Sequence, residues 1–109
     1  MPMRKGGLMI TVIASIHVKL GTRERFLNYF KRNIPNVLKD RGCIEYYPAI
    51  DSETDFSAQE LDNNVVTIIE KWESIKALQE HMCAPHMAVY RENVKDIVEK
   101  VVLKVLKNA

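Results

Sequence analysis

Residues 70–90 read EKWESIKALQEHMCAPHMAVY, and this stretch decides how the rest of the chain is arranged. Its first residues end a run of alternating apolar side chains, which is typical of a β-strand. Ser74 is a favourable N-cap residue for a helix, and Pro85 suits the first turn of a second helix. We therefore expect a strand followed by two helices. The same stretch contains the only tryptophan of the chain and two of its three histidines.

The remaining sequence completes a four-stranded pattern. Strands are expected at about residues 9–19, 43–50, 65–72 and 101–106, and helices after Thr22, Ser74 and Pro85. Pro35 should kink or divide the first helix, and Pro48 argues for an edge position or a bulge in the second strand. The acidic stretch 51–64 is interpreted as a loop. The order β-α-β-β-α-(α)-β predicts an α+β fold of the ferredoxin-like, split βαβ type: a four-stranded antiparallel sheet with helices on one face.

Apolar side chains occur on both faces of the predicted strands. Ile13, Ile69 and Leu106 point away from the face that would meet the helices. Helices on one side of a sheet cover only one face, so the other face needs a partner. We expect a homodimer through this sheet face, with His17 at the interface.

Composition narrows the class of protein. The 109 residues suit one domain at 9–109, preceded by a flexible leader at 1–8. The net charge of +2 gives no reason to expect nucleic acid or a membrane as partner. Two cysteines, Cys43 and Cys83, make a poor disulfide framework, so we expect reduced, buried thiols in a cytoplasmic protein.

Strand periodicity places Ile68, Glu70 and Trp72 on one face. If that face meets the helices, desolvation would raise the pKa of Glu70 and make it a usable proton acceptor near neutral pH. The alternative is a solvated carboxylate, or one paired with a lysine. Trp72 is either a core residue or a flat wall for an aromatic ligand.

Two histidines flank the break between the second and third helices. His81 lies at the margin of the apolar stripe formed by Ile75, Leu78 and Met82. His86 lies in the first turn of the third helix, where the helix dipole disfavours imidazolium and leaves a ring able to accept a proton. Either histidine could instead satisfy backbone groups at the junction.

Cofactor and metal motifs are not found. The spacing His-x4-His is no recognised metal signature, and neither a cysteine nor a carboxylate completes a ligand set, so we expect no metal. A Gly-rich phosphate loop, a Gly-x-Ser-x-Gly elbow and a Rossmann fingerprint are also missing. A flavin or nicotinamide held by its usual motif is therefore not encoded.

The order and spacing of several short motifs resemble the antibiotic biosynthesis monooxygenase family, most closely its small quinol monooxygenases. These motifs are Pro35–Cys43, Tyr46-x-Pro48, and Glu70–Ile75 continuing to Pro85–Met87, and the likeness extends from Met9 to Lys107. The resemblance implies a dimeric α+β barrel that oxidises a quinol or polyphenol with O₂ and no cofactor. Ile68 stands where some relatives carry asparagine, so an asparagine-assisted mechanism is not implied.

The resemblance also suggests roles for the candidate residues. His81, His86 or Glu70 would act as the base, and the substrate would contact Trp72, Tyr46, Ile68 and Tyr90. Two other functions stay open on this scaffold. One is isomerisation of a phosphorylated dione, as in autoinducer catabolism, although helical spacing does not aim both Arg91 and Lys95 inward. The other is a non-catalytic dimer that binds a small aromatic molecule.

Overall fold

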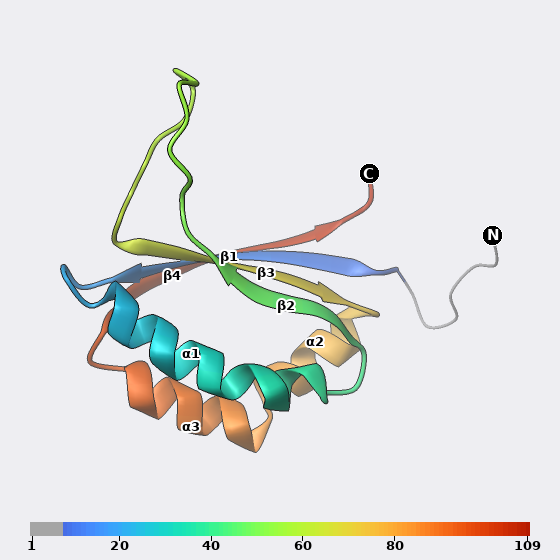
Figure 1. The fold of residues 1–109 in the computed structure, drawn as a ribbon. Helices are drawn as coiled ribbons and strands as arrows, with labels where there is room; N and C mark the ends of the chain where they lie inside the picture. The colour runs from blue at the N-terminus through green and yellow to red at the C-terminus, as the bar shows by residue number, and fades with distance from the viewer. Residues whose placement is uncertain (1–7) are drawn as a thin grey trace.

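The computed structural model describes residues 8–109, which form one four-stranded antiparallel sheet with three helices against one of its faces (Figure 1). The elements are β1 (Ile10–Val18), α1 (Arg23–Leu38), β2 (Cys43–Ala49), β3 (Val65–Trp72), α2 (Ile75–Met82), α3 (Pro85–Val94) and β4 (Val98–Lys107). The strand order is β2-β3-β1-β4. This arrangement confirms the predicted α+β, ferredoxin-like fold. Apart from Leu8, the predicted leader lies outside the described residues.

The two central strands present alternate side chains to the helices. Every second residue of β1, from Ile10 to Val18, is buried, and so is every second residue of β3, from Val66 to Trp72. The α1 helix packs Phe26, Phe30 and Val37 onto this face. The remaining face of the sheet has no helix against it in the described part of the chain (Figure 1). The core is therefore one layer thick, between the helices and the inner sheet face.

The first helix is not divided at its proline, and its predicted N-cap residue makes a different hydrogen bond from the expected one. Pro35 lies inside α1 and does not divide it. Thr22 occupies the N-cap position, but its hydroxyl donates to the Lys19 carbonyl at 2.6 Å rather than accepting from the helix. A helix of this length, packed on a sheet, tolerates one missing backbone hydrogen bond because tertiary packing supplies most of its stability.

The second helix buries a different face from the predicted one. Ser74 caps it as expected, since its Oγ accepts from the Ala77 amide at 3.1 Å. The buried side chains include Leu78 and His81, whereas Ile75 and Met82 are exposed. Eight residues make barely two turns, too few for apolar periodicity to decide the inward face. His81 therefore lies in the centre of that face, not at its margin.

Two strand predictions are refined by the hydrogen-bond register. β2 is an edge strand, as Pro48 indicated, and its register shifts between Cys43 and Glu45. This bulge leaves Ile44 exposed while Tyr46 stays buried. β4 begins at Val98, three residues earlier than expected, because its pairing with β1 extends to Val18.

Residues 50–64 form the predicted loop, which Figure 1 shows extending from the sheet on the side away from the helices. No helix in residues 8–109 is long and apolar enough to cross a membrane.

Candidate active site

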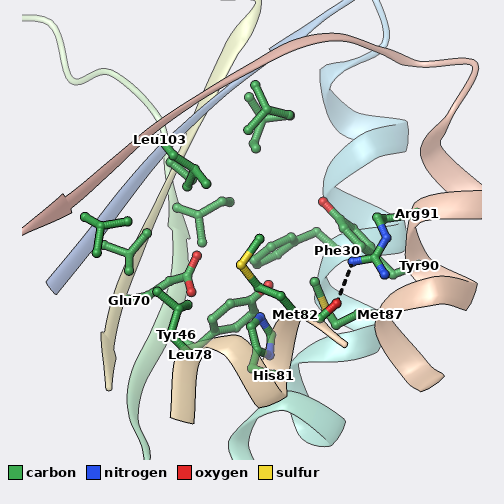
Figure 2. Close-up of a pocket in the computed structure, with 16 residues that line it drawn as sticks. Phe30, Tyr46, Glu70, Leu78, His81, Met82, Met87, Tyr90, Arg91 and Leu103 are labelled. Carbon is green, nitrogen blue, oxygen red and sulfur yellow. Dashed lines mark hydrogen bonds between the residues drawn. The ribbon is translucent and has the colours of Figure 1, made fainter. Parts of the chain in front are cut away.

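A cavity of about 270 Å³ lies between the inner face of the sheet and the helices (Figure 2). It is slightly below the roughly 300–1,000 Å³ typical of small-molecule sites. Its lining comes from every strand and helix and is mostly apolar: Val12, Ala14, Ile16, Phe30, Tyr46, Ile68, Glu70, Leu78, His81, Met82, Met87, Tyr90, Arg91, Val101, Leu103 and Val105. Of the seven residues predicted to be catalytic or substrate-binding, five line the cavity: Tyr46, Ile68, Glu70, His81 and Tyr90. Trp72 and His86 do not.

One wall of the cavity is aromatic. The Phe30 ring stacks on Tyr46, with centroids 5.1 Å apart and planes at 17°. Tyr90 meets Phe30 edge to face at 5.9 Å. Burial is the main cause that raises the pKa of both tyrosines well above the usual value, so the two phenols stay neutral. This wall offers flat apolar surface with two hydroxyl groups, which suits an aromatic ligand.

Trp72 lies behind the cavity instead of lining it. Its side chain is fully buried, and its indole N–H donates to Oε1 of Glu70 at 2.9 Å. Its rings also pack on the imidazole of His81, with centroids 4.5 Å apart. The interpretation of Trp72 as a substrate wall therefore needs correction: it is a core residue that holds Glu70 and His81 side by side.

Glu70 presents a carboxyl group to an apolar cavity. Burial raises its pKa, and the hydrogen bond from Trp72 opposes this rise only in part. The sequence predicted this direction from the strand pattern. A carboxyl group of this kind exchanges a proton nearer to neutral pH than an exposed glutamate does.

His81 is oriented by a carboxylate that the sequence did not reveal. Its Nδ1 lies 2.9 Å from Oδ2 of Asp40, in the turn between α1 and β2. Because a carboxylate only accepts, Nδ1 carries the proton and Nε2 is left with its lone pair. The ring makes no other hydrogen bond within residues 8–109, so Nε2 is unbonded there, and His81 lines the cavity. Burial lowers the pKa of His81, with Asp40 acting against the shift, so the ring is a neutral proton acceptor.

His86 forms hydrogen bonds with the same Asp40 carboxylate. Its Nε2 lies 2.9 and 3.0 Å from the two oxygens of Asp40, and its Nδ1 lies 3.2 Å from Nδ2 of Asn33. Asn36 donates to Oδ1 of Asn33 at 3.0 Å, which fixes the orientation of the Asn33 amide. His86 therefore accepts at Nδ1 and donates from Nε2 to Asp40.

Asp40, His81 and His86 could also hold a metal ion, since their ligand atoms lie within 4.8 Å of one another. The expectation that no carboxylate would complete a ligand set is therefore wrong. The same atoms, however, already form hydrogen bonds with one another: Nδ1 of His81 and Nε2 of His86 both bond to Asp40. Both ring nitrogens that face Asp40 carry protons in the assignment above, and a metal would have to displace both. We therefore interpret the cluster as a hydrogen-bonded network, and the expectation of no metal stays a prediction.

Sequence reasoning missed Asp40, Asn33 and Phe30 as site residues. Asn33 did carry a signal: it lies three residues after Phe30 and four before Val37, so it is a polar residue on the apolar stripe of α1. Asp40 carried none, because its role depends on which helices the turn approaches. Cys83 is exposed and Cys43 half-buried, so the expectation that both are buried is wrong.

Comparisons with protein families, with other sequences and with solved structures all find proteins similar to this chain. The family model described as antibiotic biosynthesis monooxygenase matches residues 9–93. The protein named probable quinol monooxygenase YgiN, from Escherichia coli K12, is 38% identical over 100 residues, covering 90% of this chain and 96% of that protein. A conserved protein from Methanosarcina mazei Go1 has a TM-score of 0.80 at 22% identity, covering 94% of each chain. A protein of unknown function from Bacteroides thetaiotaomicron VPI-5482 has a TM-score of 0.74 at 25% identity, covering 93% of this chain and 98% of that one.

Proposed function

The chain belongs to the antibiotic biosynthesis monooxygenase family, and from that premise we propose that it oxidises a quinol or polyphenol-type aromatic with O₂ and without a cofactor. In this proposal residues 9–109 act as one domain. The observation that carries it is the Asp40–His81 pair, because His81 keeps an unbonded Nε2 and lines an apolar cavity with an aromatic wall. These are the parts needed to turn a neutral quinol into an anion away from bulk water.

The reaction begins with proton transfer to His81. Its Nε2 takes the proton of one substrate hydroxyl, and Asp40 stabilises the resulting imidazolium. The quinol anion passes one electron to O₂, giving a semiquinone and superoxide, which combine at a ring carbon. Loss of water then leaves a hydroxyquinone. The overall balance is one quinol and one O₂ giving one hydroxyquinone and one water.

In this proposal Glu70 acts on the second oxygen of the substrate. Glu70 and His81 both contact Trp72. Glu70 accepts a hydrogen bond from the indole N–H, and the ring of His81 packs against the indole rings. A carboxyl group with a raised pKa can receive a hydroxyl proton and return it to the departing water. His86 does not line the cavity, so its role is to position Asp40.

The isomerase of a phosphorylated dione is less well supported. A phosphate group would need converging cationic side chains. Of the two candidates, Arg91 lines the cavity, whereas Lys95 pairs with Glu92 at 2.7 Å and is not part of the lining.

We also propose that a second copy of the chain covers the outer sheet face. The support is β4, which exposes apolar side chains on both faces, among them Val102 at 43% and Leu106 at 43% on the outer one. Light scattering should give a dimeric mass that Leu106→Glu reduces, while Phe56→Glu on the exposed loop does not. A monomeric wild type would contradict this. Cys43 and Cys83 form no disulfide, which agrees with the proposal of a cytoplasmic location.

The test of the reaction is oxygen consumption by metal-free protein with a reduced naphthoquinol, compared with autoxidation of the same quinol. We expect acceleration that His81→Ala lowers by about 100-fold or more. Gln79→Ala is the matched control, because Gln79 lies on the same helix as His81 but is exposed and does not line the cavity. Binding without acceleration would identify a non-catalytic binder, and equal rates in both variants would reject His81 as the base.

A further inference from the structure

Arg91 of α3 brings a fixed positive charge to the cavity. It is the one lysine or arginine among the cavity-lining residues, all of which lie in the described part of the chain. Its Nη1 donates to the carbonyl oxygen of Met82, the last residue of α2, at 3.2 Å (Figure 2). This bond links the two helices and holds the guanidinium at the rim of the cavity.

No carboxylate neutralises this guanidinium within residues 8–109. The ion pairs found there use Arg23, Lys95 and the two histidines on Asp40. The charge of Arg91 is nevertheless felt inside the site. Burial is the main cause that lowers the pKa of His81, and Arg91 lowers it further. An arginine in this state keeps several N–H donors for an oxyanion, and these donors form a planar fork that matches one.

The place of Arg91 relative to the acid–base groups limits what can bind. In Figure 2, Glu70 lies on one side of the cavity and Arg91, beside Tyr90, on the opposite side, with Phe30, Tyr46 and His81 between them. An anionic group next to Glu70 would be repelled whenever Glu70 is ionised. An anion at Arg91 would instead leave the far end of the ligand beside Glu70 and His81.

We propose that the substrate is an aromatic diol with an oxyanion substituent, such as a carboxylate, and that Arg91 binds this substituent. The inference rests on the proposed function and names its substrate class. Arg91 acts through the charged group of the ligand and takes no part in proton transfer. It favours charged over uncharged quinols and sets the orientation in which a hydroxyl reaches His81.

The test compares 1,4-dihydroxy-2-naphthoate with its methyl ester, which has the same ring system without the charge. Binding is measured under nitrogen through the fluorescence of Trp72, the only tryptophan of the chain, which packs on two cavity residues. Oxygen consumption is measured separately. The variants are Arg91→Gln and, as the matched control, Lys95→Gln, which removes a charge from the same end of α3 without touching the cavity.

We expect the wild type to bind the acid more tightly than the ester. Arg91→Gln should weaken binding of the acid by about 3- to 10-fold, as for a partly exposed ion pair, and leave the ester unchanged. Lys95→Gln should bind both ligands like the wild type. Equal affinity of the wild type for acid and ester, or equal losses for both ligands in Arg91→Gln, would overturn the subsite. Selective binding without oxygen consumption would keep the subsite and reject only the oxidation.

Discussion

Asp40 accepts a hydrogen bond from Nδ1 of His81 at 2.9 Å, although 41 residues separate them in the sequence. The contact joins the turn after α1 to the last turn of α2, and His86 at the start of α3 bonds to the same carboxylate. Three elements thus meet at one carboxylate group. The pair gives His81 a defined tautomer, and the apolar surroundings keep the ring neutral.

Asp40→Asn should abolish most activity while leaving the fold intact. The amide cannot stabilise imidazolium, and its NH₂ group can donate to Nδ1, which would place the ring proton on Nε2. We expect kcat/KM for quinol oxidation to fall by about 100-fold or more. Because the carboxylate raises the pKa of His81, the acid limb of any residual activity should move to lower pH. Asp55→Asn, on the exposed loop, is the control; equal losses in the two variants would contradict the pairing.

His86→Ala should have the opposite effect on the pH profile. His86 lowers the pKa of His81, and it also shares Asp40 with His81. Its removal should therefore shift the acid limb to higher pH. The loss of a positioning contact should reduce kcat by about 10-fold. His86→Gln retains a donor for Asp40 and should recover most of the rate. A profile that does not move in His86→Ala would count against the positioning role.

Gly42 lies in the same turn as Asp40, and its substitution should lower the stability of the fold. Its φ is +82°, and a Cβ atom there would lie 2.6 Å from Cβ of Ala77 in α2. Gly21 provides the matched control, since its φ is +78° but a Cβ would meet nothing within 4 Å. Both alanine variants carry the cost of a left-handed conformation. We expect Gly42→Ala to lower the free energy of unfolding by about 1–3 kcal/mol more than Gly21→Ala does, measured in urea.

Local features of the sequence predicted the strands and the α2 cap well. The alternation in β1 and β3 is a two-residue period that burial on one face imposes directly, and it placed Glu70 correctly. Ser74 needs only its own helix to act as a cap. These features require no knowledge of distant residues, which is why they could be read from the chain.

The acid–base pair could not be predicted in the same way. Asp40 lies in the turn after α1, two residues before Gly42, a common place for an exposed aspartate. Its function arises because the turn packs against the α2–α3 junction. The same limit applies to Trp72: strand alternation predicts its face correctly, but not that the side chain is fully buried against His81 instead of lining the cavity.

Glu70→Gln should stabilise the protein in alkaline solution while impairing turnover. Burial raises the pKa of Glu70 in the folded state above its ordinary value of 4.5. The folded state therefore binds this proton more tightly than the unfolded state, and the associated stability is lost as pH rises through the raised pKa. Glutamine is never ionised and can still accept the Trp72 N–H.

The difference between the two proteins should consequently depend on pH. Thermal unfolding should give Glu70→Gln a higher Tm than the wild type at pH 8, and the gap should close as pH falls below 4.5, where glutamate is protonated in both states. Glu45→Gln, on an exposed position of β2, is the control and should show no such trend. A gap that widens toward acid would mean that the folded protein favours the ionised form of Glu70, and would exclude this residue as a proton carrier near neutral pH.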